Sequence, residues 1–116
     1  MHSLKGHPVV GSSWEGYIVE QVKQLKPIGT DLYYYRTQVG AECDIVLAKG
    51  VHPIACVEIK LNNAPHISKG NLQSIADLKT KKNFVVAPDI TEYKTKEGII
   101  ICNVETFLTK YLSKIK

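Results

Sequence analysis

Hydrophobic residues recur along this chain at spacings typical of helices in some segments and of strands in others. Apolar side chains repeat every three or four positions in residues 14–25, 68–79 and 104–115. Alternating or wholly apolar runs, typical of strands, occur in residues 32–37, 41–48, 54–61, 83–87 and 99–102. The predicted element order is α-β-β-β-α-β-β-α. Because hairpin-forming strands come first and a helical crossover follows, we expect an α/β fold with a central mixed sheet flanked by helices.

Polar and turn-forming residues mark where the predicted helices begin and end. Pro27 and Gly29 end the first helix, and Asn103 is placed to cap the last one. The residues of the second helix expected to face the core are Leu72, Ile75 and Leu78. Asn71 and Gln73 then lie on its solvated face, unless they approach a site on the sheet.

The predicted strand at residues 54–61 holds a carboxylate beside an amine. Successive strand residues point to opposite faces, so Glu58 and Lys60 project together, about 6.6 Å apart along the strand. The residues expected to be buried on the other face are Ala55, Val57, Ile59 and Leu61. An exposed Glu58–Lys60 pair on an edge strand is the competing interpretation, because surface ion pairs are common and contribute little.

Further carboxylates lie in the elements before this strand. Glu42 and Asp44 share one face of the predicted strand at residues 41–48, where two like charges repel unless a cation or solvent intervenes. A solvent-facing strand explains both of them equally well. Glu15 lies at the edge of the apolar stripe of the first helix and so points partly inward. It also fits a capping box with Ser12, a role that does not exclude metal binding.

The carboxylates and the lysine together match the needs of metal-assisted phosphodiester hydrolysis. Such hydrolysis needs a divalent ion to polarise a phosphoryl oxygen and to lower the pKa of the attacking water, with a positive group near the developing charge. Mg²⁺ or Mn²⁺ prefers oxygen ligands and keeps several waters, so Asp44, Glu58 and a backbone carbonyl near Ile59 suffice. Lys60 would orient or deprotonate the water, or stabilise the developing charge.

The composition is that of an ordinary globular protein, with 44% hydrophobic and 22% charged residues, and predicts a single domain over residues 1–116. No apolar run approaches the roughly 20 residues of a membrane span, and the N-terminus lacks a signal-peptide core, so we expect a cytoplasmic protein without membrane contact. The scattered histidines have no zinc-binding spacing. The cysteines, expected to be reduced structural thiols, are Cys43, Cys56 and Cys102.

The formal charge of +4 is concentrated in one segment. Residues 60–82 contain five lysines and one acidic residue, Asp77, whereas basic and acidic residues cancel elsewhere. Such a segment suits DNA held by phosphate contacts, although a solvated lysine-rich helix end explains it as well. The residues singled out for nucleic-acid binding are Arg36, Lys69, Gln73, Lys79, Lys81 and Lys82. For Arg36, a salt bridge with Glu42 or Asp44 is favoured over a phosphate contact.

The candidate residues resemble, in kind and order, the motif of the PD-(D/E)xK nuclease superfamily: Glu15 on a first helix, Asp44 on a second strand and Glu58-Ile59-Lys60 on a third. The resemblance implies a restriction-endonuclease-like αβββαβ core, here with an extra strand and a C-terminal helix. It also implies that Asp44 and Glu58 are metal ligands, Lys60 the catalytic cation and Glu15 an auxiliary carboxylate. Cys43 stands where the motif name has proline, at a position that varies widely among members.

A closer resemblance extends over about residues 4–88. The segments that carry it are residues 4–17, 35–37, 40–44 and 57–60. They are similar to the C-terminal domain of unknown function of a group of prokaryotic AAA+-type ATPases, which implies an ATPase module as partner, in cis or in trans. The chain has no GxxxxGK[ST] motif and so lacks this route to ATP hydrolysis. A severed interface would expose apolar surface and favour a homodimer.

The sequence therefore predicts a Mg²⁺- or Mn²⁺-dependent nuclease that cleaves DNA internally or from its ends. A convergence of carboxylates with a lysine favours catalysis, because a purely structural role does not need it. The alternative is a non-catalytic module of the same fold that binds DNA or a partner, or regulates an ATPase.

Overall fold

Every predicted helix and strand is present within a few residues in the parts of the chain that the computed structural model describes, residues 2–6, 14–63 and 66–115. The strands are β1 (His2–Gly6), β2 (Asp31–Thr37), β3 (Glu42–Lys49), β4 (His52–Ile59), β5 (Lys82–Ala87), β6 (Tyr93–Lys94) and β7 (Ile100–Asn103). The helices are α1 (Trp14–Leu25), α2 (Lys69–Leu78) and α3 (Val104–Thr106), the last continued by η1 (Phe107–Tyr111) and η2 (Leu112–Lys114). None of these described helices is long and apolar enough to cross a membrane. The pattern missed β1 and β6 because neither has the apolar alternation of a strand.

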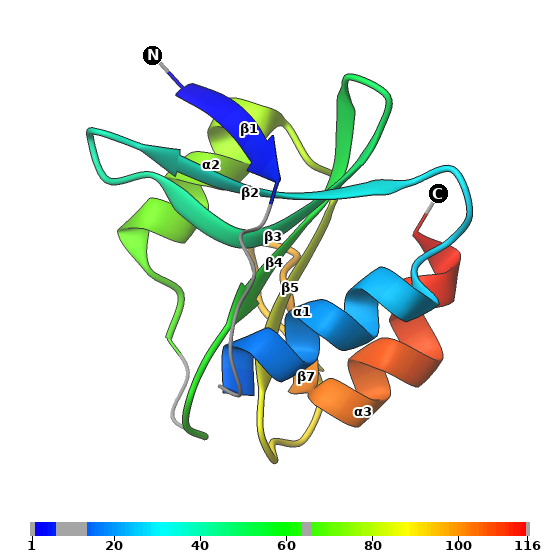
Figure 1. Cartoon of the computed structure of the whole chain (residues 1–116). Coiled ribbons are helices and arrows are strands. Elements are labelled where there is room, and N and C mark those ends of the chain that lie inside the picture. Colours follow the sequence, from blue (N-terminus) through cyan, green and yellow to red (C-terminus); the bar gives the residue numbers. More distant parts are fainter. Residues whose placement is uncertain (1, 7–13, 64–65, 116) are drawn as a thin grey trace.

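The strands form one mixed sheet in which antiparallel and parallel pairing meet at β4 (Figure 1). Their order is β1-β2-β3-β4-β5-β7-β6. The strands from β1 to β4 pair with antiparallel neighbours, β5 lies parallel to both β4 and β7, and β6 returns antiparallel to β7. The predicted α/β class, with a mixed sheet flanked by helices, is confirmed. Because β4 is central and covered on both faces, residues 55–59 are all buried.

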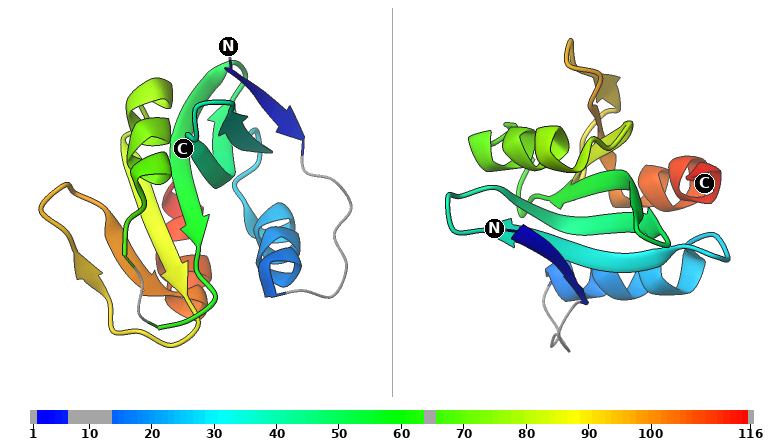
Figure 2. Two further views of the ribbon diagram at one scale, coloured as in Figure 1. Left: turned by 90° about the vertical axis from the view of Figure 1, so that its left-hand side faces the viewer. Right: turned by 90° about the horizontal axis from the view of Figure 1, so that it is seen from above.

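Helices pack against both faces of the sheet (Figure 2). α1 and the C-terminal helical segment cover one face, over a core that includes Val57 and Phe107. α2 covers the other face, over a smaller cluster around Tyr35 and Cys56. Since successive residues of β4 alternate between these layers, Glu58 points from the sheet toward α2.

The C-terminal helical segment keeps the predicted apolar stripe but is not a regular α-helix. Asn103 caps it as expected, because its Oδ1 accepts a hydrogen bond from the backbone N–H of Thr106 at 2.7 Å. α3 is one short turn, and the π-helical η1 and the 3₁₀-helical η2 follow. The stripe residues nevertheless pack in or against the main core: Val104, Phe107, Leu108, Tyr111, Leu112 and Ile115. The hydrophobic stripe thus determines which face is buried, while the hydrogen-bond ladder adapts to the packing.

α2 buries polar residues on the face that meets the sheet. Its N-cap is Ser68, whose Oγ accepts a hydrogen bond from the backbone N–H of Asn71 at 3.0 Å. Leu72 is 39% exposed, whereas Asn71 and Ser74 are buried, so the prediction that Leu72 faces the core is wrong. The helix is turned away from the predicted orientation because Ser68 and Ser74 both contact side chains of β4.

The three cysteines, Cys43, Cys56 and Cys102, are buried and free, as predicted. Cys43 and Cys56 belong to the cluster beneath α2, and Cys102 belongs to the main core. Burial raises the pKa of the Cys102 thiol to about 12. The thiol is therefore neutral at physiological pH and serves as a small packing residue.

Candidate active site

Glu58 lies near the end of β4 beneath α2 and is only 6% exposed. Its Oε1 accepts a hydrogen bond from Ser68 Oγ at 3.1 Å. Its Oε2 lies 2.9 Å from Lys60 Nζ but receives no well-directed hydrogen bond from the described residues, so charge attraction holds the pair together. A buried carboxylate is costly unless it is paired. Because β4 is central and Glu58 is buried, the interpretation as an exposed pair on an edge strand is wrong.

Lys60 follows β4 directly, and hydrogen bonds hold its backbone on both sides. Its N–H donates to Val86 O at 2.8 Å, and its carbonyl oxygen accepts from the indole Nε1 of Trp14 at 3.1 Å. Its side chain is 23% exposed, so the ammonium contacts both Glu58 and solvent. Leu61 is 72% exposed, contrary to the predicted burial, because the strand has already ended.

Asp44 lies on β3 where that strand bulges. The register between β2 and β3 shifts between Tyr33 and Tyr35, so the predicted alternation along β3 does not hold. Cys43 faces α2, whereas Ile45 belongs to the core beneath α1. The Oδ2 of Asp44 accepts a hydrogen bond from the backbone N–H of the β4 residue Ile59 at 2.7 Å. The bulge thus brings the Asp44 carboxylate to the same end of β4 as Glu58.

The surroundings of Asp44 disfavour the charged form of its carboxylate. Burial, the largest cause, raises this pKa from its ordinary value of 3.8 to about 6. The charges of Glu15, Glu58 and Glu42 raise it further, and only the hydrogen bond from Ile59 lowers it. The charges of the three other predicted carboxylates therefore all act on Asp44.

Glu15 reaches this cluster from the other face of the sheet. It lies in the first turn of α1 and is half-buried, in agreement with the predicted inward tilt. The neighbouring Trp14 holds this turn beside the end of β4, because its indole N–H donates a hydrogen bond to the carbonyl oxygen of Lys60. The proposed capping box with Ser12 lies outside the described residues.

The residues that could hold a hydrated Mg²⁺ or Mn²⁺ ion are the two carboxylates Asp44 and Glu58, which come from adjacent strands. Among the described residues, no three or more His, Cys, Asp or Glu side chains are already gathered as a metal cage. Mg²⁺ does not require a cage, since it keeps several waters and uses one or two carboxylates. The negative charges that raise the pKa of Asp44 are a feature that a bound cation would relieve.

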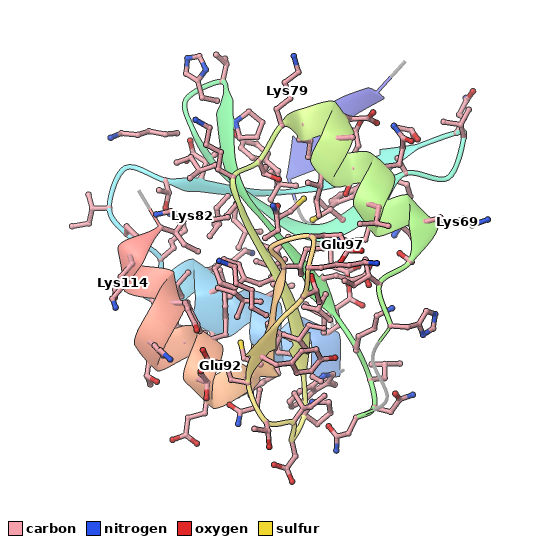
Figure 3. All side chains as sticks on the ribbon, turned by 180° about the vertical axis from the view of Figure 1, so that it is seen from behind. Lys69, Lys79, Lys82, Glu92, Glu97 and Lys114 are labelled. Carbon is pink, nitrogen blue, oxygen red and sulfur yellow. The ribbon has the colours of Figure 1, made fainter. Side chains whose placement is uncertain are left out.

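The basic residues expected to bind nucleic acid do not form one patch at this site. Lys69 and Lys79 lie at opposite ends of α2, about 15 Å apart at the rise of a helix, and Figure 3 shows them well separated. Gln73 is exposed and donates a hydrogen bond to Asp77 within the same helix. Arg36 lies 3.8 Å from Glu42 in an exposed ion pair, as favoured from the sequence.

Lys81 and Lys82 line a separate hollow of about 320 Å³ near the other end of the parallel strands. Lys82 pairs with Ala55, whereas Glu58 pairs with Val85 further along β5. The other residues of this hollow are Asn83, Phe84, Lys94, Gly98, Ile100, Tyr111, Lys114 and Ile115. Figure 3 shows Lys82 beside Lys114, whose carbonyl oxygen accepts its hydrogen bond. The basic segment at residues 60–82 is thus divided between two regions.

Sequence reasoning missed the parts played by Trp14 and Ser68. Trp14 begins the apolar repeat of the first helix, yet its indole N–H donates a hydrogen bond to the backbone of Lys60 beside the site. The Ser-x-x-Asn spacing at residues 68–71 is a usable N-cap signal, but it gives no hint that the capping hydroxyl also donates to Glu58. Those contacts join residues far apart in the chain.

Comparison with known proteins gives the family. The chain is 30% identical over 107 residues to an uncharacterized protein of Mycobacterium bovis, and equally to one of Mycobacterium tuberculosis. These matches cover 92% of this chain but only 24% of each relative, so the chain spans about a quarter of their length. No solved structure matches it. Residues 10–107 match the family described as "Domain of unknown function (DUF4143)", and the chain belongs to that family.

Proposed function

We propose that this chain is a nuclease domain of the PD-(D/E)xK type, which hydrolyses DNA phosphodiesters with Mg²⁺ or Mn²⁺ as its cofactor. The observation that carries the proposal is the meeting of Asp44 with the Glu58–Lys60 pair at one end of β3 and β4. Residues far apart in the chain supply two metal-binding carboxylates and one amine there. This combination is what phosphodiester hydrolysis requires.

Each residue has a role that follows from its surroundings. Asp44 and Glu58 would hold the cation, which when bound polarises a phosphoryl oxygen and lowers the pKa of a water. Lys60 stands at the edge of the site, where its partly exposed ammonium meets an incoming phosphate and stabilises developing negative charge. Glu15 adds negative charge beside Asp44 from α1 and strengthens the attraction for a cation.

Cleavage of supercoiled, linear and single-stranded DNA in Mg²⁺ or Mn²⁺ tests this proposal. Asp44→Ala is expected to abolish cleavage. Lys60→Ala alone would leave Glu58 buried without its cation, so the double variant Glu58→Gln/Lys60→Met is the better test of that pair. Lys23→Ala, on the exposed side of α1, is the matched control and should cleave normally. No cleavage by the parent protein, or equal cleavage by Asp44→Ala, would refute a nuclease.

A non-catalytic module that binds DNA or regulates an ATPase, in cis or in trans, is the second candidate. The specific observation that favours it is the hollow with Lys81, Lys82, Lys94 and Lys114 among its lining residues, away from the carboxylates. In this case DNA or an acidic partner surface would bind without a divalent cation, and Lys82→Ala with Lys94→Ala would weaken that binding. A homodimer would be detected in the same samples by light scattering.

A further inference from the structure

The described part of the chain leaves three buried side-chain atoms without a hydrogen-bond partner: Glu58 Oε2, Asn71 Oδ1 and Asn71 Nδ2. Asn71 is only 1% exposed, so water from bulk solvent does not satisfy its amide. Burying an amide without partners is unfavourable, and such groups are rare in folded proteins. Glu58 Oε2 still has the Lys60 ammonium at 2.9 Å, so among the described residues the Asn71 amide is the group left without any polar partner, which suggests a missing component beside it.

Contacts of α2 with β4 locate Asn71 relative to Glu58. Ser68 contacts Glu58 at 3.1 Å, and Ser74 contacts Cys56 at 3.7 Å. Asn71 lies three residues from each serine, on the same stripe of the helix, and therefore faces β4 between these two contacts. Helical side chains lean toward the helix N-terminus, so its amide is directed toward Glu58 rather than toward Cys56.

Hydrogen bonds connect the two residues on their other sides. The backbone N–H of Asn71 donates to Ser68 Oγ at 3.0 Å, and the same hydroxyl donates to Glu58 Oε1. Asn71 O accepts from Ser74 Oγ at 2.8 Å. Hydrogen bonds thus fix the backbone of Asn71, whereas its side-chain amide makes no hydrogen bond with the described residues.

The unsatisfied atoms have the right chemistry for ordered water beside a cation. A water in the hydration shell of a divalent ion directs its oxygen at the ion and has only its two protons to donate, so it needs acceptors. Asn71 Oδ1 is such an acceptor, and Glu58 Oε2, which faces Lys60, has a second lone pair that can accept as well. The amide nitrogen adds a donor that suits a phosphate oxygen or a second water.

We propose that Asn71 is a positioning residue of the site: its amide holds a water of the hydration shell of the divalent cation bound by Asp44 and Glu58. This inference rests on the proposed metal-dependent function. Partners of this kind orient the groups around a metal, and their loss commonly weakens metal binding by about 10- to 100-fold.

Asn71→Leu is the sharpest variant, because leucine has the same branched shape as asparagine but no polar atoms. Without metal, the variant should unfold at the same or a higher temperature than the parent protein, since no hydrogen bond of the described structure is lost. Titration with Mn²⁺ by calorimetry should give binding weakened about tenfold or more. Opposite changes in stability and affinity separate a role at the metal from a structural role.

Two further proteins complete the experiment. Gln73→Leu removes an exposed amide from the same helix and should bind Mn²⁺ like the parent protein. Asn71→Ser restores a hydroxyl that reaches ordered water, and should recover part of the lost affinity. If Asn71→Leu binds Mn²⁺ as tightly as the parent protein, or loses stability without losing affinity, the role of Asn71 is refuted and the proposed nuclease stands. If the parent protein itself binds no Mn²⁺, both proposals fall.

Discussion

Replacing Asp44 with asparagine should stabilise the fold at neutral pH while removing a charge on which the proposed metal binding depends. The hydrogen bond that its Oδ2 accepts from Ile59 N–H at 2.7 Å survives, because the asparagine Oδ1 accepts it equally well. What disappears is a negative charge that burial and three neighbouring glutamates disfavour. The variant therefore isolates the cost of that charge.

The magnitude follows from the pKa of Asp44, which rises from 3.8 to about 6 on folding. A carboxyl with a raised pKa binds its proton more tightly in the folded state, so the free energy of unfolding falls as pH rises between about 4 and 6 and stays low above that. A shift of about two units corresponds to about 3 kcal/mol, which partial solvent access to Asp44 reduces to about 1–2 kcal/mol. Asp44→Asn should recover this amount at pH 7.5 and almost nothing at pH 4.

Urea denaturation at pH 4 and pH 7.5, followed by the fluorescence of Trp14, measures the difference directly. Trp14 is the only tryptophan and lies beside the site, bonded to Lys60. Glu42→Gln is the matched control, because Glu42 is an exposed carboxylate of the same strand and its loss should change stability by less than about 0.5 kcal/mol. Added Mg²⁺ should stabilise the parent protein and not Asp44→Asn.

The pH dependence is the decisive part of this result. Equal stabilisation of Asp44→Asn at both pH values would point to packing rather than charge. A variant less stable than the parent protein at pH 7.5 would refute the reasoning altogether, since it would mean that the charged carboxylate is favoured by its surroundings.

Other substitutions test the packing that positions the site. Gly70→Ala should destabilise the protein by about 1–3 kcal/mol in urea denaturation, because the added Cβ would lie 2.4 Å from the backbone oxygen of Gly40. A gain in stability, which is normal for this substitution in a helix, would show that α2 shifts freely. Tyr35→Phe should cost about 1 kcal/mol in the same assay through loss of the 2.8 Å hydrogen bond to Asp77, and an unchanged midpoint would contradict it. Lys79→Gly should raise the thermal midpoint by a few degrees, or about 1 kcal/mol of stability, because Lys79 ends α2 in the left-handed conformation with φ of 57°. A lower midpoint would mean that the Lys79 side chain stabilises the fold by more than the backbone strain destabilises it.

Local sequence patterns predicted most of the secondary structure because they depend on near neighbours. The Asn103 cap and the stripe that follows it needed only residues within a few turns of one another. The same was true of the strands with clear alternation. β6 was missed because a strand of two residues carries no period, and its pairing with β7 alone defines it.

Local patterns failed where long-range contacts overrode them. Leu72 fitted an apolar stripe, yet Ser68 and Ser74 turn α2 so that Asn71 is buried in its place. Along β3, strict alternation placed Asp44 on the same face as Glu42 and Cys43 on the same face as Ile45, but the bulge against β2 breaks this alternation. A bulge is set by the partner strand and leaves little trace in the sequence that contains it.

Apart from β1 and β6, the sequence by itself determined the order of the helices and strands, the α/β class, and the carboxylates and lysine that belong to the candidate site. Only the tertiary structure decided that Glu58 is buried on a central strand, that Asp44 is held by the backbone of the neighbouring strand, and that the lysines divide between two regions. The physical reason is that the spacing of apolar residues within one helix or strand depends only on residues that are close together in the sequence. Burial, charge crowding and unsatisfied amides depend on which segments are brought together, and those pairings are settled by the packing of the whole sheet.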